Sequence, residues 1–246
     1  MQEVLNFIEA QKKYFAQLPL FDFMQDKSID PKQRISFAPC MAHYVMSFSD
    51  LNKYVLRTDE TDDILQNIIN VHTNEDDEHW PWYIWDMQKL NLNPNLSFTK
   101  TLEFIWGEET KITRQIAYQI AGCTLQASPI VKIAVIEALE AMGHVFCAVS
   151  AQVASELEAI TKTEYQYFGH VHLDAETGHT VGTPDAGYVV AELKLTEQQR
   201  QEALNAVEKT FKIFSEWTYE LLAYAQNHPM ETITDEKYKQ VLAACK

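Results

Sequence analysis

The chain has 246 residues, of which 46% are hydrophobic and 22% are charged, so it can fold around a sizeable core. Its formal net charge of −15 disfavours binding to nucleic-acid phosphates or docking on anionic membranes. Only 7 glycines and 8 prolines are present, whereas a β-sandwich or barrel needs turn residues roughly every 8–12 positions. We therefore expect an all-α protein made of long helices.

The cysteines and the N-terminal segment indicate a cytoplasmic protein. Cys40, Cys123, Cys147 and Cys245 form no CxxC pair, and we expect buried or free thiols in a reducing compartment. The amphipathic N-terminal stretch carries charges throughout, unlike a signal peptide. No run of apolar residues is long enough to cross a bilayer, so we expect no membrane partner.

Seven segments carry apolar residues at the three- and four-residue spacing of a helix. In chain order they cover residues 2–18, 38–56, 64–90, 98–121, 128–157, 164–181 and 196–227. No low-complexity segment or flexible linker separates them. We therefore expect a single helical domain over residues 1–246, packed as a bundle of about seven helices.

Several of these helices begin or bend at recognisable residues. Pro39 is tolerated in the first turn of the second helix, and the acidic residues at 58–63 suit the positive N-terminal end of the third. Pro81 is expected to kink the third helix. Ser128 and Pro129 provide a cap and a first helical residue for the fifth. A loop is expected over residues 182–187.

Histidine and acidic residues repeat at one spacing in two parts of the chain. The pattern His-x3-acid-x2-His occurs once in the third segment and once in the sixth, as His72, Asp76 and His79 and as His172, Glu176 and His179. On a helix of 3.6 residues per turn, residues with this spacing share one face. Two occurrences among 8 histidines are more than we expect by chance. Both segments are therefore candidates for metal binding.

The fifth segment adds ionisable residues to an otherwise apolar helix. Glu137, Glu140 and His144 lie within it, and Glu140 and His144 are four residues apart, so they can point the same way. A buried, unpaired carboxylate costs several kcal/mol, so such groups are paired or bind metal. Imidazole and carboxylate ligands together suit Fe, Mn, Zn or Cu. The competing interpretation is a solvated acidic face at 75–78 and a satisfied core histidine at His144.

The second pattern resembles the His-x3-Asp-x2-His motif on a late helix of the haem-oxygenase-like diiron oxidases and oxygenases. That family also places a glutamate about thirty residues earlier, which Glu140 matches, and a histidine on the third helix, which His79 matches. Helix order and lengths are similar across essentially the whole chain. The chain departs from the family at two positions, because His72 stands where a glutamate is expected and Glu176 replaces the aspartate.

The resemblance implies a haem-oxygenase-like bundle, a homodimer and one or two iron ions as cofactor. The activity that it implies is oxidation or oxygenation of a small organic substrate. In the third segment, the ligand that precedes His79 is implied to be either His72 or an acidic residue. The full set of implied metal ligands is His72, Asp76, His79, Glu140, His172, Glu176 and His179. Glu75 is an alternative acid in that segment.

The aromatic residues after His79 are candidates for a substrate pocket. Trp82, Trp85 and His144 are expected to line it beside the metal, although aromatic side chains at such positions more often pack in the core. Haem itself is not expected, because the first histidine, His43, comes after the first helix.

Two other classes of function stay open. The first is a metal-free enzyme or small-molecule binder of the same fold, as in its thiaminase-like and cofactor-synthesis branches, with Cys123 or Cys147 as a candidate nucleophile. The second is a non-catalytic protein that meets a partner through its acidic faces.

Overall fold

The computed structural model describes residues 1–93, 95–178 and 189–230. In these ranges the chain is helical and contains no strand, which confirms the all-α class. The α-helices are α1 (Gln2–Phe15), α2 (Pro19–Gln25), α3 (Pro31–Arg34), α4 (Ala42–Leu51), α5 (Ile64–Asp76), α6 (Trp80–Lys89), α7 (Phe98–Ile105), α8 (Lys111–Thr124), α9 (Pro129–Thr161), α10 (His170–Gly178) and α12 (Glu197–Asn227). Two 3-10 turns, η1 (Ala38–Met41) and η3 (Glu108–Thr110), and a π-helical turn, η2 (Asn52–Leu56), join some of them.

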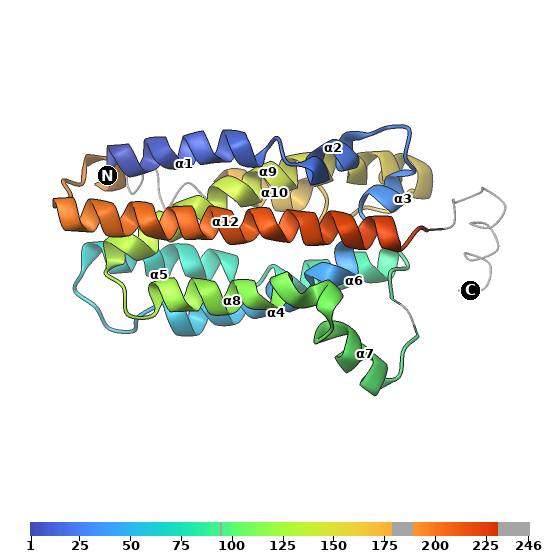
Figure 1. Cartoon of the computed structure of the whole chain (residues 1–246), viewed down its shortest axis with the longest axis horizontal. Coiled ribbons are helices and arrows are strands. Elements are labelled where there is room, and N and C mark those ends of the chain that lie inside the picture. The colour runs from blue at the N-terminus through green and yellow to red at the C-terminus, as the bar shows by residue number, and fades with distance from the viewer. Residues whose placement is uncertain (94, 179–188, 231–246) are drawn as a thin grey trace.

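The helix α9 forms the centre of the molecule. It begins after Ser128, with Pro129 in its first turn as predicted, and ends at Lys162, which adopts a left-handed conformation with φ of 58°. Its residues are mostly Ala, Val, Ile and Leu, and it packs against α1, α2, α3, α5, α8, α10 and α12. This helix therefore lies among most of the other elements of the bundle (Figure 1).

The longest helix beside α9 is α12, which runs the length of the bundle (Figure 1). Its start is fixed by a capping box, in which the Thr196 hydroxyl accepts from the Gln199 N–H and the Gln199 side chain accepts from the Thr196 N–H. The buried apolar side chains of α9, α12 and their neighbours form one continuous cluster. That cluster anchors the helices that carry the site.

The predicted third helix is wrong as a single element. The structure ends α5 at Asp76 and begins α6 at Trp80, with Pro81 in the first turn of α6. Proline lacks an N–H and its ring clashes with the carbonyl four residues earlier, so continuing α5 through Pro81 would destabilise the helix. The expected kink is therefore a complete break, and His79 lies in it as the N-cap residue of α6.

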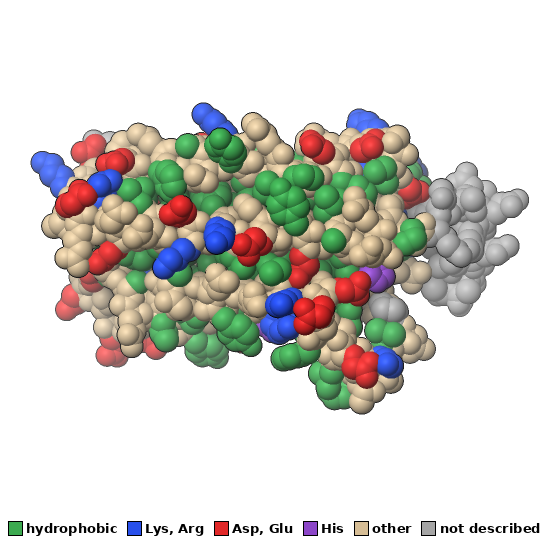
Figure 2. Space-filling view, in the orientation of Figure 1, with side chains coloured by type: hydrophobic (Ala, Val, Ile, Leu, Met, Phe, Trp, Pro, Cys, Tyr) green, Lys and Arg blue, Asp and Glu red, His purple; other side chains and the backbone are tan. Residues whose placement is uncertain are grey.

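Two other predicted helices also begin or divide differently. The segment 98–121 is split at Gly107 into α7 and α8, and no residue of α7 is buried. Figure 2 shows hydrophobic side chains exposed over α7, which projects from the bundle in Figure 1. The sixth helix begins at His170 and not near 164, while the expected loop at 182–187 lies outside the described residues. The described residues therefore form more helices than the seven expected, and several are shorter, whereas α9 and α12 are about as long as predicted.

Of the described cysteines, Cys40 and Cys147 are buried, Cys123 is half-buried, and all three are free thiols, as predicted. Cys245 lies outside the described residues. By length and composition α9 could cross a membrane, which the sequence analysis did not expect. However, 67% of its most apolar window is buried inside the bundle, as in a core helix of this kind.

Candidate metal centre

Six ionisable side chains gather into two groups between α5, α6, α9 and α10. Within each group, one nitrogen or oxygen atom of every member lies within 4.8 Å of the others. The His72 group consists of His72, Asp76 and Glu140, and the His172 group consists of His79, His172 and Glu176. Three different helices and one helix junction therefore supply the side chains.

The His72 group joins α5 to α9. His72 Nε2 lies 3.2 Å from Asp76 Oδ2, one turn later on α5, and 3.3 Å from Glu140 Oε1 on α9. His72 is 2% exposed and Asp76 is 3% exposed. Because Asp76 is the last residue of α5, the helix delivers this carboxylate just before the chain turns toward His79.

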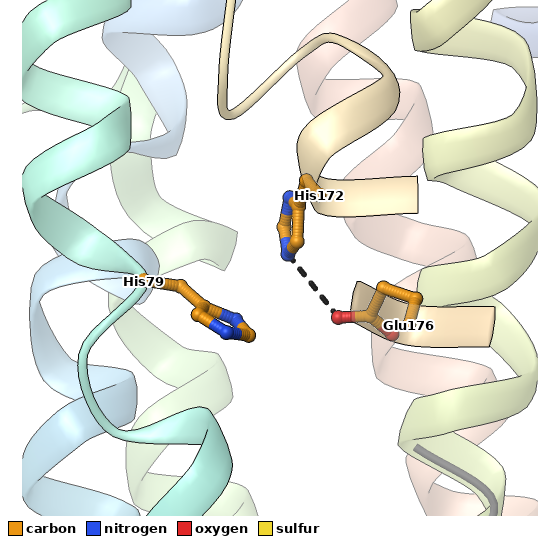
Figure 3. A group of neighbouring side chains, drawn as sticks. All are labelled: His79, His172 and Glu176. Carbon is orange, nitrogen blue, oxygen red and sulfur yellow. Dashed lines mark ion pairs between the residues drawn. The ribbon is translucent and has the colours of Figure 1, made fainter. Parts of the chain in front are cut away.

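The His172 group comes from α10 and from the junction between α5 and α6. His172 Nε2 lies 3.1 Å from Glu176 Oε1, one turn later on α10. The imidazole of His79 approaches from the opposite side, and its ring centroid lies 5.0 Å from that of His172 (Figure 3). The His79 ring is held in place by stacking on Trp82, with centroids 4.6 Å apart.

The orientation of His172 is set by its second ring nitrogen. His172 Nδ1 lies 2.9 Å from the Tyr167 carbonyl oxygen, to which it donates, so Nε2 is the atom directed at Glu176. Metal-binding histidines usually use one nitrogen for the metal and donate from the other to a carbonyl or carboxylate. The Cys147 thiol lies 3.7 Å from the same Nδ1. His172 is therefore held in an arrangement suited to binding through Nε2.

Residues of both groups line one cavity of about 100 Å³, namely Asp76 and Glu140 of the His72 group and all three members of the His172 group. The rest of the described lining is mostly aliphatic and aromatic, with Asp77, Ser49 and Thr218 as polar members, and it includes no lysine or arginine. The charges of Glu176, Asp76 and Glu140 each add to burial in raising the pKa of Tyr44, which also lines the cavity. Tyr44 is thus close to carboxylates from both groups.

The electrostatics of the site reflect crowded carboxylates around buried imidazoles. The pKa of Glu140 is raised to about 8, by burial and then by the charge of Glu176. Burial lowers the pKa of His72, but its hydrogen bonds to Asp76 and Glu140 and their charges raise it by more, to about 11. The pKa of His172 is also raised, because Cys147 and Glu176 outweigh burial. The two histidines therefore hold protons that a metal cation could replace.

Gly143 leaves the space that the Glu176 carboxylate needs. A Cβ at this position on α9 would lie 3.1 Å from Glu176 Oε2. We expect Gly143→Ala to displace that carboxylate and to weaken metal binding about tenfold, because ligand geometry tolerates only about 0.5 Å. Metal titration measures this. Gly122→Ala on α8 is the matched control, because its Cβ meets nothing within 4 Å and should only stabilise the helix, by up to about 1 kcal/mol. Equal metal affinity in both variants would contradict the prediction.

The structure rearranges the residues predicted from spacing. His72 and Asp76 share a face of α5, but His79 lies beyond its end, so the predicted common face of all three is wrong. His79 joins His172 and Glu176 instead. His179 lies outside the described residues.

The acidic run after His72 separates into different roles. Glu75 is exposed, so Asp76 is the acid of this run that reaches the site. Asp77 pairs with Arg57, whose Nη2 lies 2.8 Å from Asp77 Oδ2, and with Lys53. Asp77 is therefore paired with two cationic side chains and belongs to neither metal-binding group.

The predicted pocket residues lie around the cavity and not on it. Trp82 contacts His79, Trp85 is 47% exposed, and His144 is half-buried; none of the three is among the described residues that line the cavity. Tyr44 and Tyr167, which do line it, were not predicted. Cys147 could have been placed there from the sequence, since it lies two turns after Glu140 on α9.

The fold and site define a helical bundle with paired histidine–carboxylate groups on a largely apolar cavity. No protein-family model matches the chain, and a search of curated proteins found no match. The donor set therefore has to be judged by its own chemistry. Imidazole nitrogens and carboxylate oxygens without thiolate ligands suit iron, manganese or zinc, and dinuclear carboxylate sites in bundles draw ligands from facing helices in this way.

Proposed function

We propose that the two groups hold two iron ions and that the chain is a non-haem iron oxidoreductase of the haem-oxygenase-like fold, acting on a small organic substrate. The observation that carries the proposal is that two histidine–carboxylate groups both contribute residues to the lining of one cavity. Two ferrous ions there would supply electrons for the reduction of dioxygen.

The residues have separable roles in this proposal. His72, Asp76 and Glu140 would hold one ion, and His79, His172 and Glu176 would hold the other. Glu140 and Glu176, of which the second raises the pKa of the first through its charge, would be the candidates shared by the two ions.

The remainder of the cavity would bind the substrate. Phe146, Phe214 and Trp217 are among the apolar side chains that face it, and they would exclude water and hold an apolar body against the polar wall. We also propose a cytoplasmic location, which the free thiols support. The homodimer stays a prediction.

A metal-free small-molecule binder or enzyme of the same fold is the second candidate. It is favoured by the pairing of His72 and His172 with carboxylates at 3.1–3.3 Å, which satisfies these groups without an ion. A nucleophilic role for Cys147 within this candidate is disfavoured, because burial raises the pKa of its thiol and so opposes the reactive thiolate.

Iron content decides between the two candidates. Protein purified anaerobically and supplied with ferrous iron should bind about two ions per chain and consume dioxygen. His172→Ala should lose at least one ion and the dioxygen consumption. The matched control is His170→Ala, two residues earlier on α10, whose exposed ring bonds to Ser155 Oγ at 3.2 Å. Unchanged iron in His172→Ala would refute the ligand assignment, and no iron in the wild type would favour the metal-free candidate.

A further inference from the structure

The carboxylate of Asp86, which belongs to neither metal-binding group, holds the segment 166–168 that precedes α10. Asp86 lies on α6, is 0% exposed, and accepts hydrogen bonds from two backbone N–H groups of that segment. Asp86 Oδ1 lies 3.0 Å from the Gln166 nitrogen, and Asp86 Oδ2 lies 3.1 Å from the Phe168 nitrogen. Two N–H groups of this short segment therefore converge on one buried side chain.

The carbonyls of the same segment face His172. The Tyr167 carbonyl accepts from His172 Nδ1 at 2.9 Å, and the Gln166 carbonyl accepts from the His172 backbone N–H at 3.2 Å. The Tyr167 carbonyl and the Phe168 N–H belong to one peptide group, which is planar and rigid. That peptide therefore connects Asp86 at its N–H end to the His172 ring at its carbonyl end.

The helix that carries Asp86 also begins next to the other imidazole of the His172 group. His79 is the N-cap of α6, and Asp86 lies seven residues later, two turns along the same helix. The His79 ring stacks on Trp82, which is on α6 as well. Asp86 thus connects α6 to the start of α10, and with it the two rings whose centroids lie 5.0 Å apart.

We propose that Asp86 is a positioning residue of the metal centre, which fixes the Tyr167 peptide and thereby aims His172 Nε2 toward Glu176 and His79. The inference rests on the proposed function. Groups that accept the second ring proton of a metal-binding histidine set its tautomer and orientation, and their loss typically costs about 10–100-fold in metal affinity. Asp86 does not contact His172 itself but acts through the peptide group between Tyr167 and Phe168, which lies outside any helix.

A matched control lies in the same segment. Glu158 on α9 accepts from the Tyr165 N–H at 3.1 Å, so it also anchors this segment, but from the opposite side and without a peptide shared with His172. Asp86→Asn removes the charge and one acceptor, and Glu158→Gln does the same for the control. A purely structural role would make the two variants alike in metal binding.

The test is a titration of the metal-free full chain with cobalt(II), whose visible spectrum reports the coordination geometry. We expect Asp86→Asn to weaken the binding of one cobalt ion at least about tenfold and to alter its spectrum, while Glu158→Gln stays within about threefold of wild type. In metal-free protein, the ¹⁵N signal of His172 Nδ1 should shift in Asp86→Asn and not in the control.

The outcomes separate this inference from the proposed function. Wild-type protein that binds no cobalt overturns the metal centre itself. Wild-type protein that binds cobalt, with an unchanged affinity and spectrum in Asp86→Asn, overturns the positioning role alone. Should that variant not fold, amide hydrogen exchange in the wild type provides the test: the Phe168 amide should be protected and become more so with cobalt, and an unprotected amide contradicts the proposal.

Discussion

Replacing Glu140 by alanine is expected to reduce the iron content from about two ions per chain to one or none. Glu140 is the member of the His72 group that comes from α9, and without it His72 and Asp76 on α5 have no ligand from a facing helix in that group. The remaining ion would lose a carboxylate neighbour, because Glu140 lies close enough to Glu176 for the charge of Glu176 to raise the pKa of Glu140. Metal analysis of the reconstituted variant measures the loss.

The loss should also appear in thermal stability. A ligand present at one hundred times its Kd stabilises the folded state by about 2.7 kcal/mol. For a chain of this size that corresponds to a rise in Tm of about 5–11 °C. We expect wild-type protein to show such a rise with ferrous iron and Glu140→Ala to show much less of it.

Glu137 provides the control for this substitution. It is a half-buried glutamate one turn earlier on α9, and it belongs to neither group. Burial raises its pKa, as it does for Glu140, so Glu137→Ala removes a comparable carboxyl from the same helix. The iron content and the Tm rise should be retained in this variant. A loss of iron in Glu137→Ala equal to that in Glu140→Ala would contradict the assignment of ligands.

The second large effect concerns pH: the stability of the metal-free protein and the additional stability gained from iron should change with pH in opposite directions. The pKa of His72 is raised from 6.5 to about 11 by its carboxylate partners, against burial. Its contribution to stability is therefore fully present below about pH 6.5 and is lost as the pH rises toward 11. The pKa of Glu140 is raised from 4.5 to about 8, so the folded state also holds this proton longer, and stability falls as the pH rises through that range.

Metal binding offsets this dependence. An ion on the His72 group or the His172 group must displace protons from the imidazoles, so its apparent affinity should rise by about tenfold per pH unit for each proton released. Urea unfolding at pH 6 and pH 9 should show the metal-free protein more stable at pH 6, while the gain from iron is larger at pH 9. A gain from iron that does not change with pH would contradict proton displacement from these histidines.

The long helices could be predicted from the sequence because their signals are local. The start of α9 at Ser128 and Pro129 and the start of α12 at Thr196 were both predicted, and the structure confirms them. Caps, prolines and apolar spacing act within a few residues of chain, so they do not depend on what packs nearby. The break before α6 was wrongly predicted as a kink, although proline can do either.

The start of α10 could not be predicted in this way. The residues from 164 onward carry a helical pattern, but Asp86, about eighty residues earlier in the chain, holds the backbone N–H groups of Gln166 and Phe168. In a helix that began at residue 164, the Phe168 N–H would donate to the carbonyl of that residue, so its hydrogen bond to Asp86 competes with the helix. Only the tertiary structure brings this competing acceptor to them.

The sequence by itself determined that the protein is all-helical and that its metal-capable residues are imidazoles and carboxylates. Their residue types and their spacing along α5 and α10 are properties of the chain. Only the tertiary structure decided how these residues divide into two groups. Because α5 ends at Asp76, His79 lies beside His172, whereas His72 lies beside Glu140 of α9. The physical reason is that spacing specifies a face only while one helix continues, whereas contacts between helices depend on packing around α9.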